Sequence, residues 1–270
     1  MSWGIIWGWT KEIYWIGDWN EFINQAMSET LVVNEIYASL QGESTWAGLP
    51  CVFVRLTACN LRCSYCDTAY AFAEGNKRSL EEVLKEVRRL AAPYANGSDV
   101  DRLPLVEITG GEPLLQAGVL PLMRQLCDEG FTVLIETSGA HDISAIDPRV
   151  RRIVDLKCPS SGEESRNRWE NLVQLRRADE IKFVIGTWED YAWAKAKIAE
   201  HRLETLAVLL FSWVQPLRPE QQHASLKPVP AGQTPMTRRE LAERIVVDAL
   251  PVRFQIQMHK IIWSPDQRGV

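Results

Sequence analysis

The chain has 270 residues, of which 46% are hydrophobic and 24% charged, the composition of an ordinary globular protein with one large core. Its formal net charge of −5 gives no general electrostatic reason to expect a nucleic-acid partner. No apolar run is long enough to span a bilayer, so we expect no membrane-spanning segment. Single α/β barrels commonly reach this length, and we therefore expect one main domain.

Residues 1–28 differ from the rest of the chain in their tryptophan content. Almost half of the 11 tryptophans lie there, at Trp3, Trp7, Trp9, Trp15 and Trp19. The segment lacks the basic start and the clean apolar run of a signal peptide, and it has no Lys/Arg-rich face to bind a membrane surface. We expect residues 1–28 to be a poorly ordered extension outside the fold, with Met27 as the natural start. Residues 29–270 would form the folded domain.

From residue 31 the hydrophobic pattern alternates between strands and helices. Apolar and β-branched runs predict strands over 31–40, 51–57, 105–109, 131–136, 152–157, 180–185, 206–211 and 253–258. Helical patterns predict helices over 80–92, 116–129, 188–200 and 237–250, the first with a Ser79–Glu82 capping box. Residues 215–235, rich in Pro and Gln, predict a long surface loop. This βα alternation predicts an α/β fold with parallel strands and right-handed crossovers, a partial (β/α)6 barrel.

Three cysteines follow the strand over 51–57 in a C-x3-C-x2-C array: Cys59, Cys63 and Cys66. Structural zinc sites and ordinary [4Fe–4S] electron carriers use four protein ligands, and no fourth ligand lies nearby in the sequence. A cluster held by three thiolates leaves one iron open to a small molecule. The alternatives are a zinc site with a distant fourth ligand, or three buried cysteines without a metal.

Chemically suggestive residues follow three further predicted strands. These are Gly110-Gly111-Glu112-Pro113, then Thr137-Ser138-Gly139, and then Cys158-Pro159-Ser160. Because the carboxyl ends of parallel strands meet on one face, we expect these segments and the cysteine array to form one site. Gly110 and Gly111 would let the backbone approach a ligand closely, since they lack Cβ. Glu136 and Ser138 could bind a ribose or an amino group.

The cysteine array, with GGEP some 45 residues later, resembles the radical S-adenosylmethionine (SAM) superfamily. Within it, the segments SLQGES, ITGGEPLLQ, ETSGA, DLKCPSSGE and the terminal RGV resemble the 7-carboxy-7-deazaguanine synthase family. The likeness runs from about Val33 to Val270. Ala58 stands where a glycine often precedes the first cysteine, a departure that leaves the three thiol ligands intact.

The resemblance implies a reaction, its cofactors and its partners. The family converts 6-carboxy-5,6,7,8-tetrahydropterin to 7-carboxy-7-deazaguanine and releases ammonia, on the route to queuosine and related deazapurines. It uses a [4Fe–4S] cluster, SAM as a catalytic cofactor and Mg²⁺. We further expect a flavodoxin- or ferredoxin-type electron donor and a homodimer. An oxygen-sensitive cluster and free thiols at the scattered cysteines point to the reducing cytoplasm.

The resemblance also assigns roles to residues. Cys59, Cys63 and Cys66 would hold the cluster, and Thr68 would put a hydroxyl on Mg²⁺, which prefers oxygen ligands. The residues expected to bind SAM are Tyr65, Cys66, Asp67, Gly110, Gly111, Glu112, Glu136, Ser138, Lys157 and Ser160. Those expected to bind substrate are Leu40, Gln41, Gly42, Arg55, Thr109, His259 and Val270. Without the resemblance, Thr68 would be interpreted as a loop hydroxyl capping the backbone, and His259 as a structural histidine.

The chain end and two rival functions complete the expectations. We expect Ile261, Ile262 and Trp263 to pack against the barrel and to bring Val270 across its open mouth, although chain ends fray by default. One rival is another radical SAM enzyme, such as a glycyl-radical activase, against which the QGE segment and the RGV tail argue. The other is a non-enzymatic iron–sulfur or zinc module, which would leave GGEP and ETSG unexplained.

Overall fold

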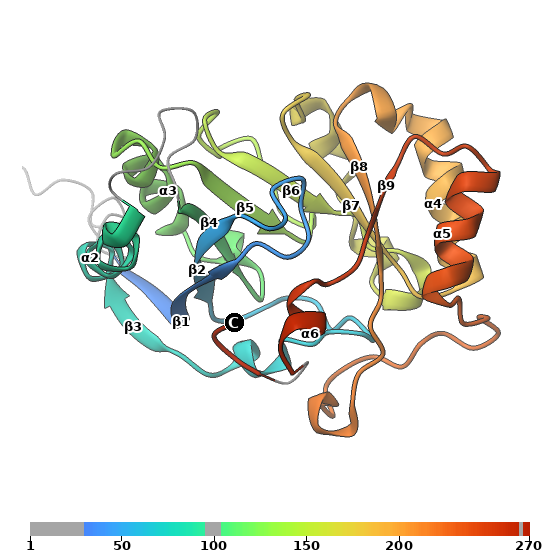
Figure 1. Ribbon diagram of the computed structural model, residues 1–270, viewed down its shortest axis with the longest axis horizontal. Helices are drawn as coiled ribbons and strands as arrows, with labels where there is room; N and C mark the ends of the chain where they lie inside the picture. Colours follow the sequence, from blue (N-terminus) through green and yellow to red (C-terminus); the bar gives the residue numbers. More distant parts are fainter. Residues whose placement is uncertain (1–29, 95–103, 265–266) are drawn as a thin grey trace, which may run out of the picture.

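A computed structural model describes residues 30–94, 104–264 and 267–270 of the chain (Figure 1). The expected extension over residues 1–28 lies outside these ranges. Within them, no helix is long and apolar enough to cross a membrane.

One nine-stranded sheet organises the fold, with the strand order β3-β1-β2-β4-β5-β6-β7-β8-β9. Strand β2 and the strands β4 to β9 run parallel, and no pairing among the described residues joins β3 to β9. The sheet is therefore an open, curved half-barrel, which confirms the predicted fold class. The strands are β1 (Thr30–Leu40), β2 (Pro50–Leu56), β3 (Asn76–Ser79), β4 (Leu105–Gly110), β5 (Val133–Thr137), β6 (Arg151–Asp155), β7 (Glu180–Ile185), β8 (Val208–Trp213) and β9 (Arg253–Gln255).

Two strands at one edge run against the direction of the barrel. Strand β1 is antiparallel to both β2 and β3. The sequence did not predict β3, because Asn-Lys-Arg-Ser has no apolar alternation. Polar and charged side chains suit an edge strand, since they oppose pairing with another chain.

Four α-helices lie close to their predicted bounds, and each packs an apolar face against the sheet. The predicted capping box of Ser79 and Glu82 is present, and Thr187 and Thr237 cap two further helices in the same way. The α-helices are α2 (Leu80–Ala91), α3 (Val119–Asp128), α4 (Trp188–His201), α5 (Arg238–Val247) and the short α6 (His259–Ile262). The 3-10 helices are η1 (Ala69–Phe72), η2 (Ala92–Tyr94), η3 (Pro113–Leu115), η4 (Pro159–Ser161), η5 (Glu164–Arg166), η6 (Trp169–Gln174), η7 (Leu203–Thr205) and η8 (Pro219–Gln221).

The alternation of strands and α-helices is interrupted in the middle of the chain, where two connections between strands contain no α-helix. The connections from β5 to β6 and from β6 to β7 consist of turns and 3-10 helices. Residues 138–150 contain Gly139, Asp142, Asp147 and Pro148, which favour turns.

The expected packing of the C-terminal tail against the barrel is partly wrong, because the side chains of Ile261 and Ile262 are 59% and 51% exposed.

Side chains alternate between the two faces of each strand, and this alternation creates the site. Outward residues such as Val54, Ile108 and Ile135 pack under the helices. The floor of the half-barrel is a small apolar cluster of inward residues, Cys51, Phe53, Leu105, Leu134 and Ile153. One layer further toward the carboxyl ends, the inward residues on the same strands are Arg55, Glu107, Glu136 and Asp155. The interior is thus apolar at its floor and charged below its mouth.

Candidate active site

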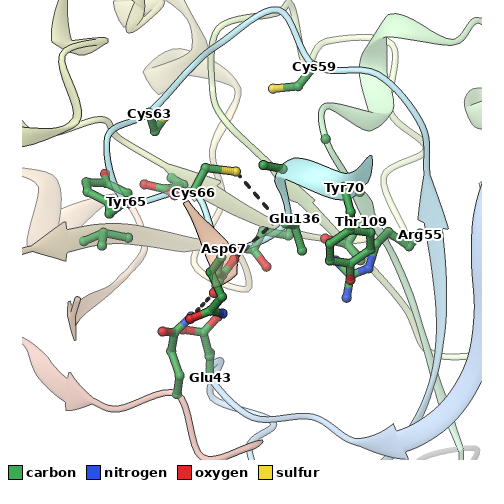
Figure 2. Close-up of a pocket in the computed structure, with 18 of the residues that line it drawn as sticks. Glu43, Arg55, Cys59, Cys63, Tyr65, Cys66, Asp67, Tyr70, Thr109 and Glu136 are labelled. Carbon is green, nitrogen blue, oxygen red and sulfur yellow. Dashed lines mark hydrogen bonds between the residues drawn. The ribbon is translucent and has the colours of Figure 1, made fainter. Parts of the chain in front are cut away.

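A cavity of about 740 Å³ opens at the carboxyl ends of the parallel strands. Its volume falls within the usual range for small-molecule sites. Its lining includes every residue assigned a site role from the sequence except Glu112 and Ser160. Figure 2 shows Cys59, Cys63 and Cys66 on one side of this cavity and Glu43 on the opposite side.

The cysteine loop, residues 57–68, leaves β2 through a strained residue. Ala58 has φ +79°, in the left-handed region that favours glycine. Its backbone is fixed on both sides, because its N–H donates to the Ala71 carbonyl (2.8 Å) and its carbonyl accepts from the Glu112 N–H (2.8 Å). Such a conformation persists only where its surroundings determine it. These bonds turn the chain so that Cys59 faces the cavity.

The three thiols share one cavity wall without converging on one point. Within the described ranges, no group of three His, Cys, Asp or Glu side chains is arranged to hold a single metal ion. Burial raises the pKa of the Cys59 thiol, and it raises the pKa of Cys63 and of Cys66 to about 11. Thiols in such surroundings ionise when a metal binds them.

The two glycines of GGEP lie directly against the cysteine loop. Gly110 has φ +145°, and a Cβ there would lie 2.2 Å from the Leu56 carbonyl oxygen. A Cβ on Gly111 would lie 2.1 Å from the Ala58 carbonyl oxygen. Both positions therefore require glycine, and their backbone lines the cavity beside the cysteines.

Glu112, which was assigned to SAM from the sequence, does not line the cavity. Its carboxylate is fully buried and accepts hydrogen bonds from the Leu114 N–H (3.0 Å) and the Thr137 hydroxyl (2.8 Å). It also accepts from the N–H (2.8 Å) and hydroxyl (2.5 Å) of Ser138. Glu112 therefore ties the glycine turn to the end of β5, and Ser138 reaches the cavity from that anchored position.

A buried lysine with two carboxylates stands at the centre of the interior. Lys182 Nζ lies 2.9 Å from Glu43 and 2.7 Å from Glu136. Burial opposes the charge of Lys182, but Glu136 and Glu43 outweigh it and raise its pKa well above the ordinary value. Lys182 and His259 likewise lower the pKa of Glu43 against its burial. Neither Lys182 nor Glu43 was predicted to belong to the site; an alternating Lys in EIKF is typical of a solvent-exposed strand position.

Glu107, in the middle of β4, was also missed. Burial, together with the charge of Glu136, raises its pKa to about 8. Its Oε2 accepts a hydrogen bond from Gln41 Nε2 (2.8 Å). Gln41 Oε1 accepts from the N–H groups of Glu43 (2.7 Å) and Ser44 (3.0 Å). The Gln41 side chain thus links the β1–β2 loop to β4 and holds this loop inside the half-barrel.

Arg55 lies in a group of aromatic and acidic side chains at the cavity wall. Its Nε donates to Glu35 (2.7 Å) and its Nη2 to the Tyr37 hydroxyl (2.8 Å). The Tyr70 hydroxyl donates to the same Glu35 oxygen (3.0 Å). Burial opposes the charge of Arg55, but Tyr37, Tyr70 and Glu35 together raise its pKa. Its Nη1 has no partner among the described residues.

The end of the cysteine loop contacts the C-terminal segment. Asp67 Oδ2 accepts from Gln257 Nε2 (3.1 Å) and pairs with Lys260. Burial would raise the pKa of Asp67, but Lys260 holds it well below the usual value. The Thr68 hydroxyl lies 3.4 Å from Asp67 Oδ1 and 3.8 Å from the Cys66 sulfur. Thr68 therefore offers an oxygen between the cysteines and the acid.

The β1–β2 loop and the chain end close the other side of the cavity. Gly42 packs against His259, since a Cβ there would lie 2.9 Å from His259 Nδ1. Arg268 pairs with Glu74 (2.7 Å), and its guanidinium carbon lies 3.8 Å from the centre of the Tyr70 ring. These contacts bring Val270 to the cavity lining, as expected from the sequence.

Buried polar atoms near the end of β6 lack hydrogen-bond partners among the described residues: the Tyr65 hydroxyl, Asp155 Oδ1 and Ser160 Oγ. Asp155 Oδ2 pairs with Lys157 (2.6 Å), and both residues line the cavity. Ser160 is buried behind it, where its N–H donates to Asp190 (2.7 Å). Because buried polar groups are nearly always paired, the unpaired atoms of Tyr65 and Asp155, which line the cavity, suit a polar ligand bound beside the cysteine loop.

Comparison with known proteins identifies the family of this chain. The model of the radical SAM superfamily matches residues 54–160. The 7-carboxy-7-deazaguanine synthase of Koribacter versatilis is 44% identical over 240 residues, which cover 88% of this chain and 99% of that protein. The enzyme of the same name from Chlorobaculum tepidum is 40% identical over 243 residues, covering 89% and 97%. QueE from Escherichia coli, at 23% identity and a TM-score of 0.60, covers 90% of this chain and 99% of its own, and it shows the fold.

Proposed function

This chain belongs to the 7-carboxy-7-deazaguanine synthase family of the radical SAM superfamily, and from that premise we propose its reaction. The protein converts 6-carboxy-5,6,7,8-tetrahydropterin to 7-carboxy-7-deazaguanine and releases ammonia. One observation carries the proposal: the three thiols and a set of buried charges suited to a carboxypterin line a single cavity.

The thiols of Cys59, Cys63 and Cys66 would hold a [4Fe–4S] cluster. Their place in one cavity lining and the unpaired polar atoms of Tyr65 and Asp155 fit the cluster together with SAM. The backbone of Gly110 and Gly111 would bind one end of SAM. When bound, the cluster and SAM supply the one-electron chemistry, and the protein supplies orientation and exclusion of water.

The charged side chains of the interior would bind and orient the pterin. Nη1 of Arg55 is a donor suited to the substrate carboxylate. Glu43, held anionic by Lys182, and the backbone of Val270 can accept hydrogen bonds from the donor-rich edge of the ring. With a pKa of about 8, Glu107 is mostly protonated at neutral pH, so its carboxyl can donate a hydrogen bond.

The remaining assignments belong to the same proposal. SAM would also contact Tyr65, Asp67, Glu136, Ser138 and Lys157, which line the cavity. Mg²⁺ would bind the Thr68 hydroxyl, because this hard cation prefers oxygen. The electron donor would be a flavodoxin or ferredoxin, and the active form a homodimer. Six free thiols fit a reducing compartment such as the cytoplasm.

The test is anaerobic reconstitution with iron and sulfide, chemical reduction, and product analysis with the carboxypterin and SAM. We expect four irons per chain, as one [4Fe–4S] cluster requires, and formation of the deazaguanine without any protein substrate. Cys63→Ala should lose the intact cluster and the product, whereas Cys127→Ala, at a position that does not line the cavity, should keep both. Stoichiometric zinc in active, anaerobically prepared protein contradicts the proposal. A requirement for a protein substrate would instead favour a glycyl-radical activase.

A further inference from the structure

A buried carboxylate that does not line the cavity holds the cysteine loop from behind. Glu163 follows β6 and is 4% exposed. Its Oε1 accepts a hydrogen bond of 2.7 Å from the backbone N–H of Arg62, the residue directly before Cys63. A charge-assisted bond to a backbone N–H is among the stronger hydrogen bonds of a protein. Glu163 therefore fixes the backbone between the first two thiols.

A lysine from a distant loop completes the arrangement. Lys227 lies in the connection from β8 to α5, and its Nζ is 2.9 Å from Glu163 Oε2 and 2.7 Å from the Gly162 carbonyl oxygen. Its backbone N–H donates to the carbonyl of Arg62 (2.9 Å). The N–H and the carbonyl of Arg62 are thus both bound, one by Glu163 and the other by Lys227.

The neighbouring turn adds two bonds to the same loop. The N–H of Ser64 donates to the Ser161 carbonyl (3.1 Å), and its hydroxyl donates to the Ser160 carbonyl (2.6 Å). The stem of Lys227 lies over Gly162, where a Cβ would be 3.1 Å from Lys227 Cδ. Residues 62–64, which include Cys63, are therefore held between two loops that carry no cysteine of the array.

We infer that Glu163, supported by Lys227, is a positioning residue that holds the cysteine loop in its metal-binding shape before the cluster binds. A buried carboxylate without a cation is costly, so the ion pair with Lys227 is what allows Glu163 to lie there as an anion. The inference rests on the proposed cluster site. It adds to that site a residue outside the cavity, the glutamate of the segment SSGE, which supports the cysteine loop.

The experiment compares four variants for retention of iron after anaerobic reconstitution. Glu163→Ala removes both bonds, whereas Glu163→Gln keeps an acceptor for Arg62 N–H and loses the ion pair. Lys227→Met removes the cation and keeps the apolar stem over Gly162. The matched control is Glu164→Gln, whose carboxylate bonds Trp193 Nε1 (2.7 Å) and does not touch the cysteine loop.

The readouts are irons per chain, the rate of iron loss to a chelator, and the melting temperature of the apo-protein. We expect Glu163→Ala to lose iron at least about tenfold faster than wild type, as removal of a hydrogen bond to a charged group predicts. The rates of iron loss from Glu163→Gln and Lys227→Met should lie between those of Glu163→Ala and wild type, and the rate from Glu164→Gln should equal that of wild type. The melting temperature of apo Lys227→Met should fall, because this variant leaves the buried Glu163 carboxylate without its cation. That of apo Glu163→Gln, which buries no charge, should stay close to wild type.

Equal rates of iron loss in wild type, Glu163→Ala and Lys227→Met overturn the inference and leave the proposed function standing. If Glu163→Ala fails to fold, an unchanged rate in Lys227→Met overturns it in the same way. Failure of the wild-type protein itself to take up iron contradicts the proposed function instead.

Discussion

Replacing Ala58 with glycine should stabilise the protein. Ala58 precedes the first cysteine with φ +79°, a conformation that costs an L-residue about 1–2 kcal/mol. Glycine avoids that cost but loses about 0.5–1 kcal/mol through the greater freedom of its unfolded chain. The alanine methyl is only partly buried, so its removal forfeits a fraction of the roughly 0.8 kcal/mol of a buried CH₂. A net gain of about 0.5 kcal/mol remains.

The assay is thermal unfolding of the apo-protein under reducing conditions. For a domain of this size, a gain of that order raises the melting temperature by about 1–2 °C. Iron content should not change, because both backbone bonds of Ala58 are available to glycine. Ala249→Gly is the control, since Ala249 also has a left-handed φ, +48°, in an exposed position after α5. If Ala249→Gly stabilises the protein and Ala58→Gly does not, the reasoning about strain at Ala58 is refuted.

Three further predictions concern the interior and the chain end. Glu107 has an ordinary pKa of 4.5 and a folded pKa of about 8, so the folded state binds the extra proton and loses stability as pH rises through this window. Glu107→Gln should remove that fall, and parallel melts from pH 5 to about 9 would reveal it. Lys182→Met leaves the half-buried Glu43 and Glu136 without their cation and should cost about 2–3 kcal/mol in urea unfolding; a change below about 1 kcal/mol refutes the assigned ion pairs. Deleting residues 269–270 should raise the KM for the carboxypterin while iron content and SAM binding persist, and an unchanged KM means that the tail does not touch substrate.

The local features of this protein could be predicted from the sequence. Apolar runs and capping residues placed the parallel strands and the four longer helices within a few residues, because these signals act over one or two turns of chain. The spacing of Cys59, Cys63 and Cys66 predicted a three-thiol site for the same reason. The order of motifs at successive strand ends predicted that they would meet, because parallel strands end on a common edge.

The pairing of buried charges was decided only by the tertiary structure. Lys182 lies 139 residues from Glu43 and 46 from Glu136, and no local pattern relates them. Glu112 was expected to face the cavity, yet it lies behind the glycine turn, bonded to Thr137 and Ser138.

Strand patterns give the alternation of side chains but not the curvature of the sheet. Alternation alone leaves open whether a charged residue of β4 or β7 faces solvent or the interior. The curvature of the half-barrel encloses one face of every strand, so Glu107 and Lys182 become buried and must find partners. The exposed Ile261 and Ile262 show the converse, since apolar side chains were expected to pack and the last turn carries them outward. The sequence alone thus determined which groups exist and where each strand ends, and the closing of the sheet decided which of those groups meet, because burial makes an unpaired charge too costly to keep.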